Sequence, residues 1–204
     1  MRPTSACDIT ILDWGSGNLG SVVRAFRRLG QEVRLESRPD MIARADRVVF
    51  PGVGAFGAVM TGIRERRLEE PLREFLRRER PFLGVCVGLQ ALFAASEESP
   101  GVPGLGVFPG SVLRLRARKV PHVGWNEVVP VPGNPQTVVA PGHAYFVNSY
   151  AAPAPDDADW IAARTDHEGW FASAIAVGTL VAVQFHPEKS GGYGAALLNR
   201  WISC

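Results

Sequence analysis

The chain has 204 residues, of which 46% are hydrophobic and 21% are charged. This balance is typical of a globular protein that buries a core without disulfides or a structural metal, and it excludes a disordered or fibrous chain. The 22 basic and 20 acidic residues give a net charge of +2, so charge gives no reason to expect nucleic acid or a membrane as partner. The length favours a single domain over residues 1–204.

Three cysteines are present, Cys7, Cys86 and Cys204. Their odd number and the absence of metal-ligand spacing predict free thiols in a reducing compartment. The first eight residues lack the basic and apolar regions of a signal peptide. We therefore expect a cytoplasmic protein.

The first half of the chain predicts alternating strands and helices. Strands are expected at 8–13, 32–36, 47–50 and 81–86, and helical segments at 18–29, at 57–80 with a break near Pro71, and at 87–96. This order is typical of an α/β fold with a mostly parallel central sheet covered by helices on both faces.

From Gly101 onward, short apolar runs separated by Pro and Gly predict antiparallel strands added to the sheet in the C-terminal half. Residues 170–185 are apolar, but Gly178 and Thr179 interrupt them, which favours two buried strands joined by a tight turn over a membrane helix. A last helix is expected at 193–202.

The segment Gly84-Val85-Cys86-Val87-Gly88 follows an apolar strand and opens a helical pattern. It is the cysteine version of a nucleophile elbow, in which glycines permit a strained strand-to-helix turn that exposes the central side chain. A helix N-terminus beside the sulfur favours the thiolate, which is the reactive form. A buried cysteine in a glycine-rich turn is the alternative, and the pattern favours the nucleophile.

A thiol nucleophile needs a base, and the base needs a group to orient it. Only His186 both ends an apolar strand, at 179–185, and has a nearby acid, Glu188. Alternate side chains of an extended segment share a face, so Glu188 can hold one imidazole nitrogen while the other faces the sulfur. His-x-Glu alone is more often a surface turn, but the elbow reverses that preference. His143 is expected in a turn and His167 in a polar loop.

Acyl transfer also requires N–H donors for the developing oxyanion. We expect one from Val87, which follows the nucleophile, and another from Val53 or Gly54 in the loop Pro51-Gly52-Val53-Gly54. An ordinary tight turn and a phosphate loop are the alternatives for this loop. No Lys-Ser/Thr pair follows it, so a nucleotide P-loop is disfavoured.

Together these segments resemble the class I (triad) glutamine amidotransferases, over nearly the whole chain. The elbow and the His-Pro-Glu segment mark this superfamily, and two further motifs resemble the glutaminase subunits of imidazole glycerol phosphate synthases. The matching segments are Asp13-Trp14-Gly15-Ser16-Gly17-Asn18-Leu19, Pro51-Gly52-Val53-Gly54-Ala55-Phe56, Gly84-Val85-Cys86-Val87-Gly88-Leu89-Gln90, Pro121-His122-Val123-Gly124-Trp125-Asn126, Tyr145-Phe146-Val147-Asn148-Ser149-Tyr150 and Gln184-Phe185-His186-Pro187-Glu188-Lys189-Ser190.

The resemblance implies a chemistry that agrees with the interpretation of the elbow. Cys86 attacks the side-chain amide of glutamine, His186 moves the proton to the leaving ammonia, and water hydrolyses the thioester to glutamate, with no cofactor and no metal. The residues expected to bind substrate are Gly52, Gln90, Asn148, Ser149 and Tyr150. Asn148 departs from the family, which usually has histidine there.

The resemblance also implies a partner, a barrel-shaped cyclase subunit in a heterodimer. The cyclase uses the ammonia to form imidazole glycerol phosphate and aminoimidazole carboxamide ribotide in histidine biosynthesis. Asn18, Trp125, Tyr145 and Lys189 are expected near it, although core packing is the alternative for Trp125 and Tyr145. A different ammonia-channelling synthase, another cysteine hydrolase and a non-catalytic binding module are the alternative functions.

Overall fold

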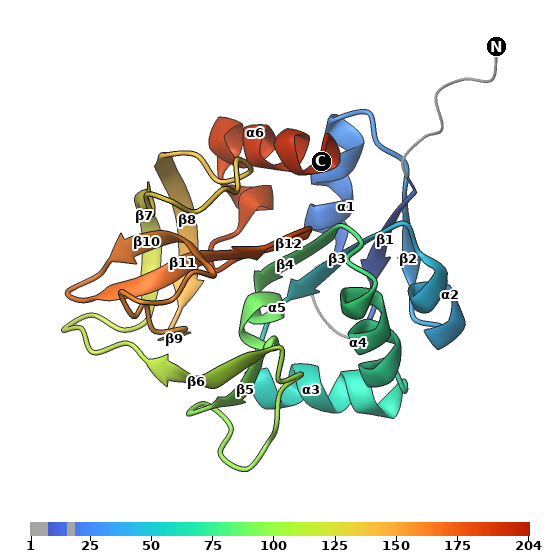
Figure 1. Ribbon diagram of the computed structural model, residues 1–204, viewed down its shortest axis with the longest axis horizontal. Helices are drawn as coiled ribbons and strands as arrows, with labels where there is room; N and C mark the ends of the chain where they lie inside the picture. Colours follow the sequence, from blue (N-terminus) through green and yellow to red (C-terminus); the bar gives the residue numbers. More distant parts are fainter. Residues whose placement is uncertain (1–7, 16–18) are drawn as a thin grey trace.

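The computed structural model describes residues 8–15 and 19–204. These residues form a nine-stranded mixed sheet with helices on both sides and a small three-stranded sheet at its border (Figure 1). The elements are β1 (Ile9–Leu12), α1 (Leu19–Arg28), β2 (Val33–Glu36), α2 (Pro39–Arg44), β3 (Arg47–Gly52), α3 (Phe56–Glu65), α4 (Glu69–Arg77), β4 (Phe82–Cys86), α5 (Val87–Gln90), β5 (Phe93–Ser96), β6 (Phe108–Arg114), β7 (His122–Pro130), β8 (Gly142–Asn148), β9 (Tyr150–Ala151), β10 (Ile161–Asp166), β11 (Trp170–Val177), β12 (Leu180–Val183), the 3₁₀ turn η1 (Pro187–Lys189) and α6 (Gly191–Ile202).

The parallel half of the sheet has the order β2-β1-β3-β4-β12. Residues of β1, β3, β4 and β12 are almost all buried, as expected for strands covered on both faces. The register pairs Gly52, at the end of β3, with Cys86, at the end of β4, while β12 lies parallel on the other side of β4. The segments that follow β3, β4 and β12 therefore meet at one edge of the sheet.

The antiparallel half continues the same sheet through β11, β10, β7 and β8. The expected turn in the apolar 170–185 segment lies between β11 and β12, where Gly178 has φ +56°. Two buried strands at this segment, parallel strands from the first half of the chain and antiparallel additions from the second half are all confirmed. Among the described residues, no helix is long and apolar enough to cross a membrane.

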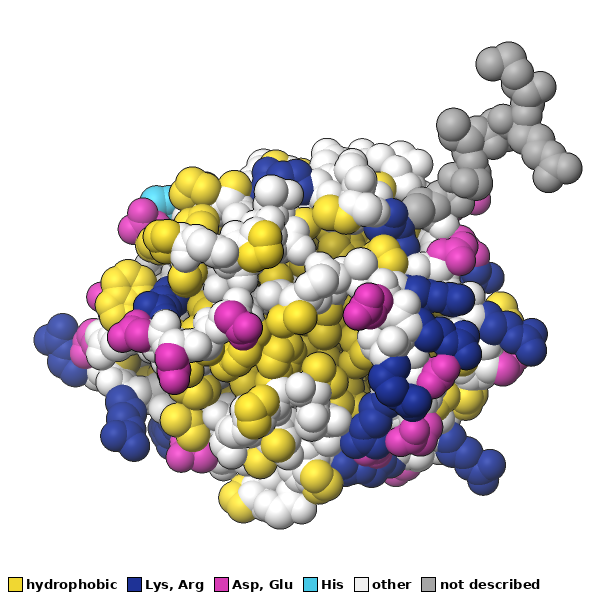
Figure 2. Space-filling view, in the orientation of Figure 1, with side chains coloured by type: hydrophobic (Ala, Val, Ile, Leu, Met, Phe, Trp, Pro, Cys, Tyr) yellow, Lys and Arg dark blue, Asp and Glu magenta, His cyan; other side chains and the backbone are white. Residues whose placement is uncertain are grey.

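Helices cover the parallel half from both sides. Figure 1 shows α1 and α6 against one face and α2, α3 and α4 against the other. On the first side, the rings of Phe26 and Trp201 meet edge to face at 5.9 Å between centroids. On the solvent side of α4, arginines gather among carboxylates (Figure 2) and pair with them, as in Arg77–Glu74 at 3.0 Å. Such exposed pairs contribute little stability, but they neutralise what would otherwise be a basic patch.

Two expectations for the order of elements are wrong. A short helix, α2, lies between the second and third strands, where none was expected; Pro39 begins it and Ile42 is its buried residue. Proline at the first helical position is a start signal, because its missing N–H has no partner in the helix anyway. The helical break expected near Pro71 is present. It falls after α3, where Arg67 has φ +56°, and Pro71 lies in the first turn of α4.

The expected helix at 87–96 is the second error. Only one turn, α5, is helical, and the chain then enters β5, which pairs in parallel with β6 through Phe93 and Phe108. The two rings lie 5.6 Å apart, between centroids. Pairing with a strand remote in sequence overrides a weak local helix preference here.

Candidate active site

Cys86 occupies a strained turn between β4 and α5. Its backbone has φ +55° and ψ −111°, a conformation that L-residues rarely adopt, and its side chain is buried except for a small exposed part. The flanking glycines are needed for close packing. A Cβ on Gly88 would lie 2.0 Å from the carbonyl oxygen of Phe50, and one on Gly84 would lie 2.8 Å from Cβ of Ala182. The elbow therefore packs closely against both neighbouring strands, β3 and β12.

His186 and Glu188 are in contact. Nδ1 of His186 lies 2.8 Å from Oε1 of Glu188, and both side chains are about 95% buried, with 4% and 5% exposed. The local backbone differs from the prediction, because Glu188 lies in the 3₁₀ turn η1 and only His186 is extended. The carboxylate accepts from Nδ1–H, which leaves Nε2 as the nitrogen free to serve another group.

The pKa of His186 is raised to about 9. Burial alone would lower the pKa, but hydrogen bonds to Cys86 and Glu188, and the charges of these two groups, outweigh it. The imidazole is therefore protonated at neutral pH and lies between two acidic groups.

Gln184, which the sequence did not single out, also contacts the sulfur. Its Nε2 donates to Sγ of Cys86 at 3.6 Å, and its side chain is fully buried. Gln90 in turn donates to Oε1 of Gln184 at 3.1 Å and to the carbonyl of Tyr150 at 2.9 Å. Gln184 lies two residues before His186, so the alternation of side chains along an extended segment was a usable signal.

A cavity of about 330 Å³ opens at Cys86. Most of the residues predicted for the site line it: Val53, Gly54, Cys86, Val87, Gln90, Asn148, Ser149, Tyr150, His186 and Lys189. Gly52 lines a smaller cavity of about 20 Å³ beside His186 and Glu188. The chain thus brings segments from four distant parts of the sequence to one edge of the sheet.

Glu98 lines the same 330 Å³ cavity and was missed by the sequence analysis. Its Oε2 accepts a hydrogen bond from the main chain of Phe56 at 2.7 Å, which fixes the carboxylate in place. It is the one carboxylate among the described residues that line this cavity. No local pattern could have singled it out, because the Glu-Glu-Ser-Pro stretch around it is typical of a surface loop.

Asn148, which stands where the family usually has histidine, is buried and braces the cavity wall. Its Nδ2 donates to the carbonyl of Tyr150 at 3.1 Å. Gln90 donates to the same oxygen at 2.9 Å. The two side-chain amides together hold the backbone that follows Ser149. Asn148, although shorter than histidine, therefore still helps to fix this wall of the cavity.

Two of the residues expected near a partner, Trp125 and Tyr145, lie side by side on β7 and β8. Trp125 of β7 pairs directly with Tyr145 of β8, their rings lie 6.1 Å apart, and Trp125 is 57% exposed. The neighbouring pair, Val123 and Val147, is also exposed, so the four side chains form one apolar strip on the β7–β8 ribbon. Core packing is therefore the wrong interpretation of Trp125.

Lys189 is exposed and lines the same 330 Å³ cavity as Cys86. Asn18 and Cys7 lie outside the described residues. His143 is a strand residue of β8 rather than the turn residue that was expected, whereas His167 lies in the loop between β10 and β11 as predicted.

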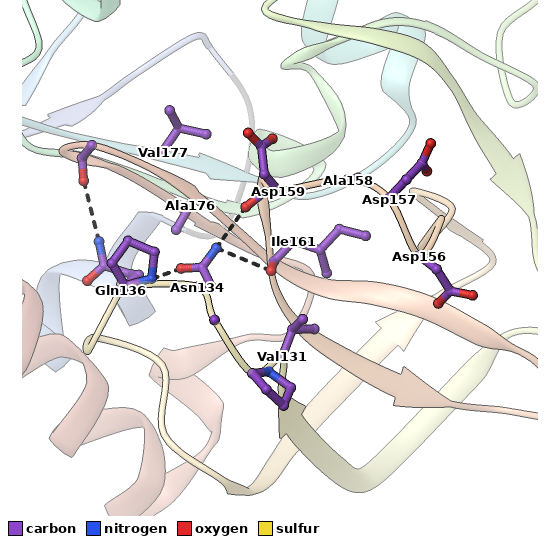
Figure 3. Close-up of a pocket in the computed structure, with 14 residues that line it drawn as sticks. Val131, Asn134, Gln136, Asp156, Asp157, Ala158, Asp159, Ile161, Ala176 and Val177 are labelled. Atoms are coloured by element: carbon purple, nitrogen blue, oxygen red, sulfur yellow. Dashed lines mark hydrogen bonds between the residues drawn. The ribbon is translucent and has the colours of Figure 1, made fainter.

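A larger cavity than the one at Cys86 lies elsewhere. It measures about 670 Å³ and is formed by residues 131–136 and 156–159 with parts of β10 and β11. Figure 3 shows the side chain of Asn134 turned toward the backbone, bonded to the carbonyls of Asp159 and Ile161. The carboxylates of Asp156 and Asp157 point away from Asn134. None of the predicted site residues lines this cavity, so its size does not make it the active site.

Comparison with known proteins agrees with this geometry. The family model described as "Glutamine amidotransferase class-I" matches residues 10–202. The "Imidazole glycerol phosphate synthase subunit HisH" of Nitrosococcus oceani is 44% identical over 203 residues, which cover 96% of each chain. The HisH subunit of Mycolicibacterium paratuberculosis is 45% identical, over 95% of this chain and 96% of its own.

A plant relative is longer. The chloroplastic "Imidazole glycerol phosphate synthase hisHF" of Arabidopsis thaliana is 43% identical over 99% of this chain, which spans 35% of that protein. A solved structure titled "Crystal structure of glutamine amidotransferase" superposes with a TM-score of 0.74 at 20% identity, over 95% of this chain and 96% of that one. At that identity the likeness shows the fold alone.

Fold, family model and relatives agree on the class. The chain belongs to the class-I glutamine amidotransferases, and within them to the HisH subunits of imidazole glycerol phosphate synthase.

Proposed function

We propose that the chain hydrolyses glutamine to glutamate and ammonia at Cys86, with His186 as general acid and base and Glu188 as its orienting group. The observation that carries this proposal is the buried contact of 2.8 Å between His186 and Glu188 at the cavity that Cys86 opens into. Residues 1–204 form one amidotransferase domain in this proposal, and the reaction needs no cofactor.

The first half-reaction forms a thioester. The Cys86 thiolate attacks the amide carbon of glutamine, and the negative charge moves to the carbonyl oxygen, where N–H groups of Val87 and of the Val53–Gly54 segment stabilise it. The protonated His186 gives its proton to the leaving nitrogen, so that NH₃ departs as the carbon–nitrogen bond breaks. Its raised pKa, about 9, supports this starting state.

Water completes the cycle. His186, now neutral, takes a proton from a water molecule as its oxygen attacks the thioester carbon. The carbon–sulfur bond breaks, glutamate leaves, and the thiolate and imidazolium are restored. The Nε2 group of Gln184, 3.6 Å from Sγ of Cys86, donates a hydrogen bond that stabilises the thiolate in both half-reactions.

The amino-acid end of glutamine needs partners of both charges. Glu98 is suited to the α-ammonium group, because it is a fixed carboxylate in the cavity wall. Gly52, Gln90, Asn148, Ser149 and Tyr150 supply the remaining substrate contacts. The two amide bonds to the Tyr150 carbonyl support this assignment, because they hold the 149–150 backbone at the cavity.

The ammonia is used by a cyclase subunit of the β/α-barrel type, bound as a heterodimer in the cytoplasm. The relatives' names support a synthase with more than one function, since the matched region is about a third of the Arabidopsis hisHF protein. The exposed strip around Trp125 and Tyr145, together with Lys189 and Asn18, is the surface proposed for the contact. With ammonia, the cyclase forms imidazole glycerol phosphate and aminoimidazole carboxamide ribotide.

The test is an assay of glutamate release and of cyclised product, in a mixture of this chain, the cyclase subunit and its nucleotide substrate. Both products should form at equal rates when glutamine is the only nitrogen source. Glutamate without cyclised product would favour the second candidate, a subunit of a different ammonia-channelling synthase. Failure to form glutamate under any condition would remove the proposed activity.

A further inference from the structure

The side chain of Trp14 is fixed at the end of β1 and reaches the next strand. It is 3% exposed, and its indole Nε1–H donates to the carbonyl oxygen of Pro51 at 2.9 Å. The ring packs closely against Gly62 of α3, where the absence of a side chain leaves room for it. A Cβ on Gly62 would lie 2.8 Å from Cε3 of Trp14 and 2.5 Å from its carbonyl oxygen. The indole is therefore held on one side by packing and on the other by a buried hydrogen bond.

Pro51 is where β3 approaches the nucleophile. Pro51 and Gly52 end this strand, and they pair with Val85 and Cys86. A Cβ on Gly52 would lie 2.4 Å from the main-chain nitrogen of Gly88, so this end of β3 lies directly against the elbow. Beyond Gly52 the packing loosens, because Gly54 is exposed and has φ +95°.

We propose that Trp14 is a positioning residue for the glutaminase reaction. It holds the Pro51–Gly52 peptide in one orientation, and so confines rotation of the loop to Val53 and Gly54, where the oxyanion donor is assigned. The carbonyl that the indole holds belongs to the peptide that enters the loop. Turning that peptide would leave a buried indole N–H unpaired, which is unfavourable. This inference rests on the proposed function, since it concerns the loop that serves the reaction.

The competing explanation is that Trp14 is only a core residue whose N–H happens to find a carbonyl. The chain offers a matched control for this explanation in Trp201. It is 1% exposed, and its Nε1 donates to the carbonyl of Phe82 at 3.3 Å. Phe82 begins β4 and Cys86 ends it, so this second bond lies at the opposite end of the sheet from the elbow. A purely structural role predicts the same consequence for both tryptophans.

The experiment compares Trp14→Phe with Trp201→Phe in the full chain bound to the cyclase subunit. Phenylalanine keeps an aromatic ring and removes the N–H. We expect Trp14→Phe to lower the kcat for glutamate release by about 10-fold, a fraction of the loss that follows removal of a whole oxyanion donor. The KM for glutamine should stay within about twofold, because ground-state binding is unchanged. We expect Trp201→Phe to lower the melting temperature similarly and to leave kcat unchanged.

An unchanged kcat in Trp14→Phe, equal kcat losses in both variants, or a change in KM alone would overturn the inference. If Trp14→Phe does not fold, benzothienylalanine at position 14 replaces the indole N–H by sulfur at nearly the same shape, and the same kcat loss is expected. The wild-type chain measured in parallel separates the two proposals. Absence of wild-type glutamate release contradicts the proposed function, whereas normal wild-type release with an unaffected position-14 variant contradicts only the inference.

Discussion

The main-chain N–H of His186 donates to the carbonyl of Tyr145 at 2.9 Å. Ser190 adds a second connection, because its Oγ donates to the His186 carbonyl at 2.7 Å and accepts from the Tyr145 N–H at 2.9 Å. Tyr145 thus presents its ring to the exposed strip on β7–β8 while its backbone holds the residue proposed as the base. A partner that binds the strip would contact Tyr145, whose carbonyl is hydrogen-bonded to the main chain of His186.

Replacing Cys86 by serine should abolish glutamate release while leaving the fold and partner binding intact. Serine is nearly isosteric but its hydroxyl is a far weaker nucleophile at neutral pH than a thiolate. A diazo-ketone analogue of glutamine should form one covalent adduct on the wild-type chain, which mass spectrometry would locate at Cys86. An adduct at Cys7 or Cys204 instead would overturn the assignment.

His186 and Glu188 should differ in the size of their effects. Removing the imidazole in His186→Ala takes away proton transfer, which is worth about 10²- to 10⁴-fold in rate. Glu188→Gln should cost less, because the amide keeps a hydrogen-bond acceptor of the same shape for Nδ1–H. Steady-state kcat values of the two variants decide this. Equal losses would show that Glu188 does more than orient the ring.

The raised pKa of His186 predicts a loss of activity at alkaline pH. The protonated imidazole is the acid for the leaving ammonia, so kcat should fall as pH rises through about 9, where His186 loses its proton. Glu188→Gln removes one of the interactions that raise this pKa, so the fall should begin at lower pH in that variant. A kcat profile that is flat to pH 10, or one unmoved in Glu188→Gln, would contradict the proposed protonation state.

The apolar strip on β7–β8 should be required for partner binding. Trp125→Ala should weaken binding of the cyclase subunit by about 2 kcal/mol or more, as expected for a tryptophan central to an interface. Trp170 is a matched control, since it too is 57% exposed but lies on β11. Trp170→Ala should leave the dissociation constant unchanged in isothermal titration. Equal effects of the two substitutions would remove the strip as the docking surface.

The sequence predicted those parts of the fold and of the site that depend only on neighbouring residues. The apolar strands and the glycines around Cys86 follow from neighbouring residues alone, and so does the short separation of His186 and Glu188. Glu98 was missed because only the tertiary fold brings its loop to the cavity. The strand β5 was predicted as helix for the same reason, since its partner Phe108 lies in another segment.

We further propose that the cyclase partner controls glutamine hydrolysis at Cys86. Ammonia released without an acceptor is lost to water, and the Gly52-Val53-Gly54 loop, with φ +95° at Gly54, has the freedom to present or withdraw one oxyanion donor. One donor is worth roughly 10²- to 10³-fold in rate. Lys189→Ala and Asn18→Ala, at the proposed contact, should lower the stimulation more than they lower complex formation.

The most direct measurement is steady-state glutamate production by the chain alone, by the chain with cyclase, and by the complex with the cyclase's nucleotide ligand bound. We expect slow release from the chain alone and a rise of about 10²- to 10³-fold in the liganded complex, which is the effect of one oxyanion donor on the rate. Equal turnover in all three conditions would contradict it.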